Sequence, residues 1–170
     1  QIFNDIMAMR ECEYALKLDP SMEKALSLWL AANYDREAKL RPGQVDPTRE
    51  PEQPDAHYYG VAAGAQYLNA VLARALHDHN SPVALRAVRS LNVIIGTSNM
   101  FSGDFGQPIV DAMSYSDRQI RFEAAMAIAG ALPQKRFGGQ DRVVPILAQA
   151  LTQSGKPNLL VIRPSQNDIN

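Results

Sequence analysis

The residues best suited to chemistry are two histidines that flank an aspartate, His77-Asp78-His79. Neutral imidazoles and a carboxylate are good metal ligands. On a continuous helix, however, residues two apart point about 200° away from each other, so these imidazoles could converge only beyond a helix end. Asn80-Ser81-Pro82 follows at once and begins a new helix. We therefore interpret the cluster as a helix C-terminus, where imidazole interacts favourably with the helix dipole, and predict no metal site.

The other reactive or ligand-binding patterns also indicate structural roles. Cys12 stands among apolar neighbours on a predicted helix without an evident histidine partner, so we expect a buried, inert thiol. The glycine-rich segments 60–64 and 103–106 lack the spacing and the lysine-serine pair of a Walker loop. One cysteine excludes a disulfide framework and a cysteine-based zinc site. The sequence therefore predicts no catalytic residue and no cofactor.

The charge balance narrows the class of partner. The 170 residues include 17 basic and 18 acidic side chains, which give a net charge of −1. This balance excludes a strongly basic nucleic-acid binder, and the arginines alternate with aspartates, as on solvated faces. No apolar run reaches the ~18 residues of a membrane span, and no signal peptide is visible. We expect a cytoplasmic protein without a membrane segment or a nucleic-acid partner, and a piece of a longer chain because it begins at Gln1 in a helical pattern.

Apolar residues recur at helical spacing over most of the chain. Helices are predicted at 3–19, 22–40, 56–64, 66–78, 82–95, 107–115, 117–132 and 141–153. Residues 41–55 hold four prolines and almost no apolar side chain, which predicts a linker between a helical hairpin at 1–40 and the helices of 56–155. Four consecutive apolar residues at 159–162 predict a short buried strand, and residues 156–170 a tail or the start of a further domain.

The segment 56–155 contains an internal repeat of 37 residues. Pro108-Ile109 recurs as Pro145-Ile146, where proline in a first helical turn costs little. The same offset joins Leu72 to Ile109, Leu76 to Met113, Val83 to Ile120, Ala87 to Ala124, and Leu91 to Ile128. Each helix pair has an apolar face that it cannot bury alone, so we expect the pairs to stack as an all-α, right-handed α-solenoid.

The stretch from Ile120 to Ile128 has the form V-R-x-x-A-x-x-A-L and follows Asp117. This arrangement resembles HEAT repeats, in particular the short bacterial kind also seen in phycobilin-lyase-like proteins. Asp117 and Arg121 match the acidic residue and the arginine of that family. Their spacing also predicts a helical ion pair, with Asp117 in the first turn. The preceding unit has Asn80 and Ala84 instead, so no continuous ladder of such pairs is expected.

The two ends of the chain resemble other families. The first forty residues resemble a tetratricopeptide (TPR) helix pair at Ala8, Ala15 and Pro20, with a generic helical hairpin as the alternative. Residues 159–168 resemble the first strand and loop of a response-regulator receiver or a related α/β domain. That resemblance implies a degenerate domain without the usual magnesium site, because Arg163 and Pro164 replace the acidic residues that follow the strand.

The second helices of the stacked pairs are expected to line a concave surface. There, Leu72, Leu76, Ile109 and Met113 should face the core. The equivalent outward positions, predicted to contact a protein partner, are Arg74, His77, Asp111 and Ser114. We predict a protein–protein interaction scaffold within a larger multidomain protein. The alternatives are a phycobilin-lyase-like enzyme component, suggested by the repeat resemblance, and a nucleic-acid-binding solenoid. A plain solvated face at these four residues also stays open.

Overall fold

The computed structural model describes residues 2–41, 43–50, 52–94, 96 and 107–152. These residues form α-helices, one short 3-10 helix and no strand, which confirms the predicted all-α class. The elements are α1 (Phe3–Leu18), α2 (Glu23–Ala38), α3 (Ala56–Ala63), α4 (Ala65–His77), α5 (Ser81–Ile94), α6 (Pro108–Ala112), α7 (Arg118–Ala131), η1 (Gln140–Arg142) and α8 (Val143–Thr152). The strand predicted at 159–162 and the further domain at 156–170 lie outside the described residues. None of the described helices has the length and apolar character to cross a membrane.

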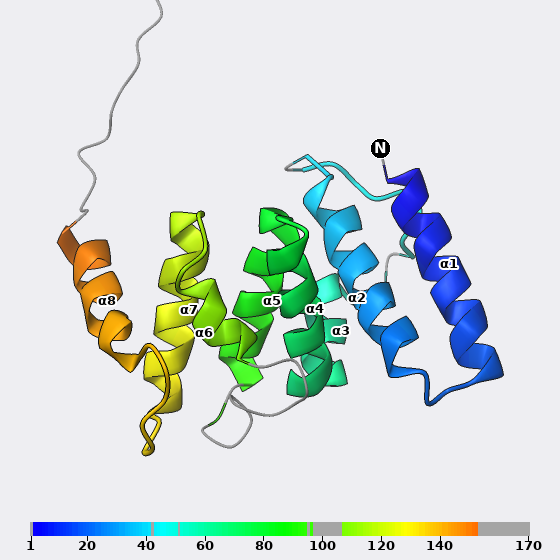
Figure 1. Cartoon of the computed structure of the whole chain (residues 1–170). Helices are drawn as coiled ribbons and strands as arrows, with labels where there is room; N and C mark the ends of the chain where they lie inside the picture. The colour runs from blue at the N-terminus through cyan, green and yellow to red at the C-terminus, as the bar shows by residue number, and fades with distance from the viewer. Residues whose placement is uncertain (1, 42, 51, 95, 97–106, 153–170) are drawn as a thin grey trace, which may run out of the picture.

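The helices follow one another in a row from α1 at one end to α8 at the other (Figure 1). The α1–α2 hairpin packs through α2 against α3, α4 and α5. Beyond it, α5 contacts both α4 and α7, α6 contacts α4 and α7, and α8 contacts α7. Each helix is thus covered by helices near it in the sequence, the arrangement expected when short units bury one another's apolar faces.

One continuous core runs from Leu30 in α2 to Val143 at the start of α8. Small residues occupy its helix contacts: Ala84, Ala87, Ala124, Ala125 and Ala127 are fully buried. The residues joined by the 37-residue offset are also buried, except for Leu76 and Ile146, which are half-buried, and Pro145, which is exposed. The buried members are Leu72, Val83, Ala87, Leu91, Pro108, Ile109, Met113, Ile120, Ala124 and Ile128.

The expected ion pair between Asp117 and Arg121 is wrong. Asp117 is the N-cap of α7, and its carboxylate accepts hydrogen bonds from the N–H groups of Gln119 and Ile120 at 2.8 and 3.3 Å. Arg121 instead donates to the backbone carbonyls of Tyr115 and Ser116, at 2.7 and 2.8 Å. These bonds satisfy carbonyl groups of the turn that connects α6 to α7. The helix predicted at 107–115 is shorter in the structure, where α6 ends at Ala112.

The polar segment between α2 and α3 folds back onto α2. The carboxylate of Asp46 lies 3.3 Å from the guanidinium of Arg36. Both side chains are buried: that of Asp46 is 6% exposed and that of Arg36 is 5% exposed. Thr48 donates to the same carboxylate through its hydroxyl at 2.6 Å and its N–H at 2.9 Å. At the end of the segment, Glu37 accepts a hydrogen bond from the N–H of Ala56 at 2.9 Å. Polar side chains therefore hold this segment, and the start of α3, against α2.

The surroundings of Asp46 determine whether the pKa of its carboxyl group is raised or lowered. Burial alone would raise the pKa of this carboxyl, but the two hydrogen bonds from Thr48 and the charges of Arg36 and Arg49 outweigh burial and lower it. A lowered folded-state pKa means that ionised Asp46 stabilises the fold above the unfolded-state value of about 3.9. That contribution is lost as the pH falls through the folded-state value.

Asp46→Asn is expected to lower the free energy of unfolding by about 3 kcal/mol at pH 7, because it leaves the buried guanidinium of Arg36 without a counter-charge. Below pH ~4 the difference from the wild type should shrink, since the carboxyl of the unfolded chain takes up a proton first and the folded-state carboxyl follows only as the pH falls through its lowered pKa. Urea unfolding at pH 7 and at lower pH measures both values. A difference that stays constant across this range would contradict the ion-pair explanation.

Ala124→Leu should overpack the helix contacts of α7 and lower the free energy of unfolding by about 1–3 kcal/mol. Ala148→Leu is the matched control, because Ala148 is exposed on α8 and its enlargement should change stability by no more than ~0.5 kcal/mol. Denaturant unfolding of the two variants measures the contrast. Equal stabilities would place Ala124 outside a tight helix contact.

Candidate functional site

The four residues predicted to contact a partner are exposed and fall into two groups. Arg74 and His77, near the end of α4, both bind Asp78: the guanidinium at 3.1 Å and the imidazole Nδ1 at 3.0 Å from its carboxylate. Ser114 accepts a hydrogen bond from Arg142, and Asp111 lies on α6. The structure thus joins Arg74 to His77 through Asp78. Asp111 and Ser114 belong to the α6 region, which packs against α4.

The charge pattern at the end of α4 keeps Asp78 ionised. The hydrogen bond from His77, together with the charges of Arg74 and His77, lowers the pKa of the Asp78 carboxyl. The next residue, His79, has a positive φ of 54° and stacks on Tyr115 of the α6–α7 turn. The two histidines therefore have different partners. Within the described part of the chain, no group of three His, Cys, Asp or Glu side chains could hold a metal ion.

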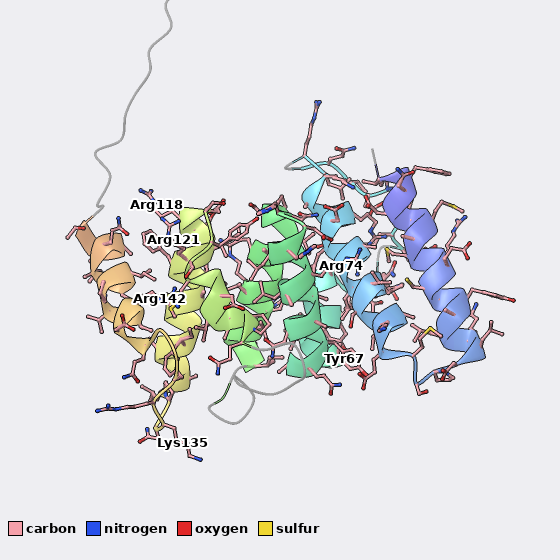
Figure 2. The ribbon with its side chains drawn as sticks, viewed as in Figure 1. Tyr67, Arg74, Arg118, Arg121, Lys135 and Arg142 are labelled. Carbon is pink, nitrogen blue, oxygen red and sulfur yellow. The ribbon has the colours of Figure 1, made fainter. Side chains whose placement is uncertain are left out.

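A groove of about 390 Å³ opens beside Arg74, between α1, α2, α4 and the start of α5. Alanines line it from three helices, namely Ala8, Ala31, Ala32 and Ala75. Four charged side chains also border it: Glu11, Asp35, Arg74 and Asp78. Figure 2 shows Arg74 on α4 next to α2, where the hairpin meets the following helices. Small residues leave the groove open, because a larger side chain at these positions would fill it.

Cys12 also lines this groove and is half-buried, whereas a buried thiol was predicted. Burial is the main cause that raises the pKa of its thiol, and the negative charges of Glu13 and Glu11 add to it. A thiol with a raised pKa is a weak nucleophile at neutral pH, because the thiolate is the reactive form. We therefore assign Cys12 to the wall of the groove and not to chemistry.

A second site, which the sequence does not predict, lies where α2, α3 and α5 meet. Tyr34 and Ser90 are buried, and the hydroxyl groups of the two lie 2.7 Å apart. His57 Nδ1 lies 2.8 Å from the same serine Oγ. Burial raises the pKa of Tyr34 to about 12, although the bond to Ser90 opposes the rise, so the phenol stays protonated and can donate. Ser90 can in turn donate to a neutral His57, and the three side chains then form one hydrogen-bonded chain.

A serine beside a histidine is also the arrangement of an activated nucleophile. Here, however, Ser90 has no exposed surface, and its Oγ is held between the phenol and the imidazole. A substrate therefore cannot reach this oxygen. The geometry assigns Ser90 to linking Tyr34 and His57 across the helix contact.

Close approach of α3 to α2 at this point depends on Gly60. A Cβ atom on Gly60 would lie 1.9 Å from the hydroxyl oxygen of Tyr34, far inside van der Waals contact. Only glycine leaves room for the phenol to reach Ser90. A glycine within a helix costs about 1 kcal/mol relative to alanine. The presence of Gly60 in a predicted helix was therefore the one local sign in the sequence that another group packs closely there.

Tyr34 and His57, the two ends of this hydrogen-bonded chain, line a hollow of about 330 Å³. Its lining residues are Tyr34, Glu37, His57, Arg86 and Arg89. Arg89 pairs through Nε with Glu123 of α7 at 2.9 Å. Arg86 makes one long hydrogen bond, 3.5 Å, to the carbonyl of Pro82. The hollow therefore has a cationic wall, formed by two arginines one helical turn apart on α5.

Comparison with known proteins adds no family to this description. No protein-family model, curated protein or solved structure matches the chain.

Gly60→Ala is expected to lower the free energy of unfolding by about 1–3 kcal/mol, because the new methyl group displaces the hydroxyl of Tyr34. In a Tyr34→Phe background the same change should cost less, since the oxygen that it meets is gone. Gly130→Ala is the control: its Cβ would have open space on α7, and it should stabilise by ~0.5–1 kcal/mol. Equal costs of Gly60→Ala in both backgrounds would exclude the proposed contact.

Proposed function

We propose that the chain is a protein–protein interaction scaffold without catalysis of its own, a right-handed α-solenoid of HEAT-like helix pairs behind a TPR-like hairpin. The observation that carries the proposal is the alanine-lined groove between α1, α2 and α4, bordered by Arg74 and Asp78. The stacking of α4–α8 on neighbours near in sequence supports the solenoid.

The groove suits a segment of protein better than a small polar ligand. Its floor is mainly apolar and its small side chains allow close approach, as in grooves that take the apolar face of a helix. Charged groups at the edge then fix the register of the segment, while the apolar floor supplies most of the affinity.

The border charges favour a basic segment. Three of the four charged residues that line the groove are carboxylates, and Arg74 already pairs with Asp78. Asp35 is engaged at 2.7 Å by Lys39, the residue that follows α2, which leaves Glu11 as the carboxylate that a cation in the partner would meet first. We propose a partner helix with small apolar residues on one side and a lysine or arginine that reaches Glu11.

A large side chain placed in the groove tests this proposal without disturbing the core. Ala8 is exposed on α1 and lines the groove, so Ala8→Trp should block a partner while leaving the fold intact. A partner isolated by cross-linking to the full chain is purified, and its dissociation constant is measured for the wild type and the variants. We expect Ala8→Trp to weaken binding roughly tenfold or more. Ala148→Trp, at an exposed alanine of α8, is the matched control.

Two results would contradict the proposal. The first is equal affinity of the partner for Ala8→Trp and the wild type. The second is that the chain binds an arbitrary oligonucleotide at low salt with a steep salt dependence, which would indicate the nucleic-acid-binding alternative. A change in the absorbance of an added bilin would favour the phycobilin-lyase-like alternative instead.

A further inference from the structure

We propose that the hollow between α2, α3 and α5 is a binding site for the phosphate group of a small ligand, held by Arg86, Arg89 and His57. The site does not involve the alanine-lined groove, and no residue lines both. The inference is therefore independent of the proposed scaffold function.

The two arginines provide more hydrogen-bond donors than the fold uses. A guanidinium carries five N–H donors. Within the described residues, Arg86 uses one of them in a 3.5 Å bond to a backbone carbonyl, and Arg89 uses Nε–H for Glu123. Residues three apart on a helix are neighbours, so these two cations also repel each other when nothing lies between them. A bound oxyanion would satisfy the remaining donors and remove that repulsion.

The hydrogen-bonded chain orients a third donor. When Tyr34 donates to Ser90 and Ser90 donates to Nδ1 of His57, the neutral imidazole carries its proton on Nε2. A protonated imidazole also has a proton on Nε2. Because Nδ1 is held by Ser90 and the ring lines the hollow, Nε2–H is the donor of His57 that remains for a ligand. Three donor side chains from two helices suit a tetrahedral phosphate better than a planar carboxylate, which one arginine can hold by itself.

The two carboxylates in closest relation to the site, Glu37 in its lining and Glu123 on Arg89, do not cancel this cationic wall. Glu37 lines the hollow, but its carboxylate is already engaged by the Ala56 N–H at 2.9 Å and by the guanidinium of Arg49 at 3.5 Å. Glu123 lies on α7, outside the lining residues, and engages Arg89 through Nε alone. The lining therefore keeps one net positive charge with neutral His57, and two when His57 is protonated.

A neighbouring hollow provides room for the rest of the ligand. It measures about 440 Å³, shares Glu37 and Arg86 with the proposed site, and extends along the 43–50 loop past Leu40 and Val45. Its other charged lining residues are Arg41, Asp46, Arg49, Glu50 and Asp55. A phosphate monoester could place its phosphate between the arginines and its organic group there. Inorganic phosphate would use the first hollow only.

The experiment is calorimetric titration of the full chain with inorganic phosphate and with phenyl phosphate, in a buffer free of other oxyanions. We expect saturable binding with one site per chain and a shift of the His57 imidazole resonances on addition of either ligand. Arg86→Gln should weaken binding roughly tenfold, the effect of losing one charge-assisted hydrogen bond. Arg89→Gln serves as a second variant, and circular dichroism verifies that each variant is folded.

Arg118→Gln is the matched control, because Arg118 is an exposed arginine of α7 that lies over the ring of Phe122 and not in the hollow. It should leave phosphate binding unchanged. Three results would overturn the proposal: no saturable binding of either phosphate, equal weakening by Arg118→Gln and Arg86→Gln, or tighter binding of acetate than of phosphate. Tighter binding of phenyl phosphate than of inorganic phosphate would support a monoester as the ligand, and the reverse order would support the free ion.

Discussion

The contact on which the rest of the structure depends is that of the buried Tyr34 side chain with α3 and α5. Its ring lies in the core beside Leu68, and its hydroxyl group reaches Ser90 across the place where Gly60 omits a side chain. Removing a polar hydroxyl from water is unfavourable unless a hydrogen bond replaces the lost hydration. The phenol can therefore be buried only where the backbone of α3 and the hydroxyl of Ser90 are both in place. This requirement fixes the position of the α1–α2 hairpin relative to α3 and α5.

The alanine-lined groove and the arginine-lined hollow both form at this joint, the place where the α1–α2 hairpin meets α3, α4 and α5. The alanine-lined groove lies where α1 and α2 meet α4, and the arginine-lined hollow lies where α2 meets α3 and α5. The joint also depends on the loop after α2, since Arg36 and Asp46 attach that loop and Glu37 attaches the start of α3. Because α2 and α5 line both sites, a ligand that shifts these helices at one site would alter the other. A scaffold whose partner groove adjoins a small-ligand site could thus be regulated by that ligand.

Much of the fold could be predicted from the sequence because its signals are local. Proline and the 3.6-residue period mark helix ends to within a few residues: 66–78, 82–95 and 117–132 were predicted, against Ala65–His77, Ser81–Ile94 and Arg118–Ala131. The second site could not be predicted in this way. Tyr34 and His57 lie 56 and 33 residues from Ser90, and no spacing rule joins them. Likewise, the polar composition of 41–55 was typical of a linker, yet its charges form a buried ion pair with α2.

Native-state hydrogen exchange of the full chain tests most directly the claim that the hairpin and the following helices form one rigid joint. The account predicts that core amides of α2, from Leu30 to Tyr34, exchange with the same free energy of opening as those of α5, from Ala87 to Leu91. Both sets should also show the same dependence on denaturant, because a single cooperative opening exposes them. Exchange of the α2 amides through an opening that leaves α5 protected would contradict this account, because the hairpin would then be a separate unit.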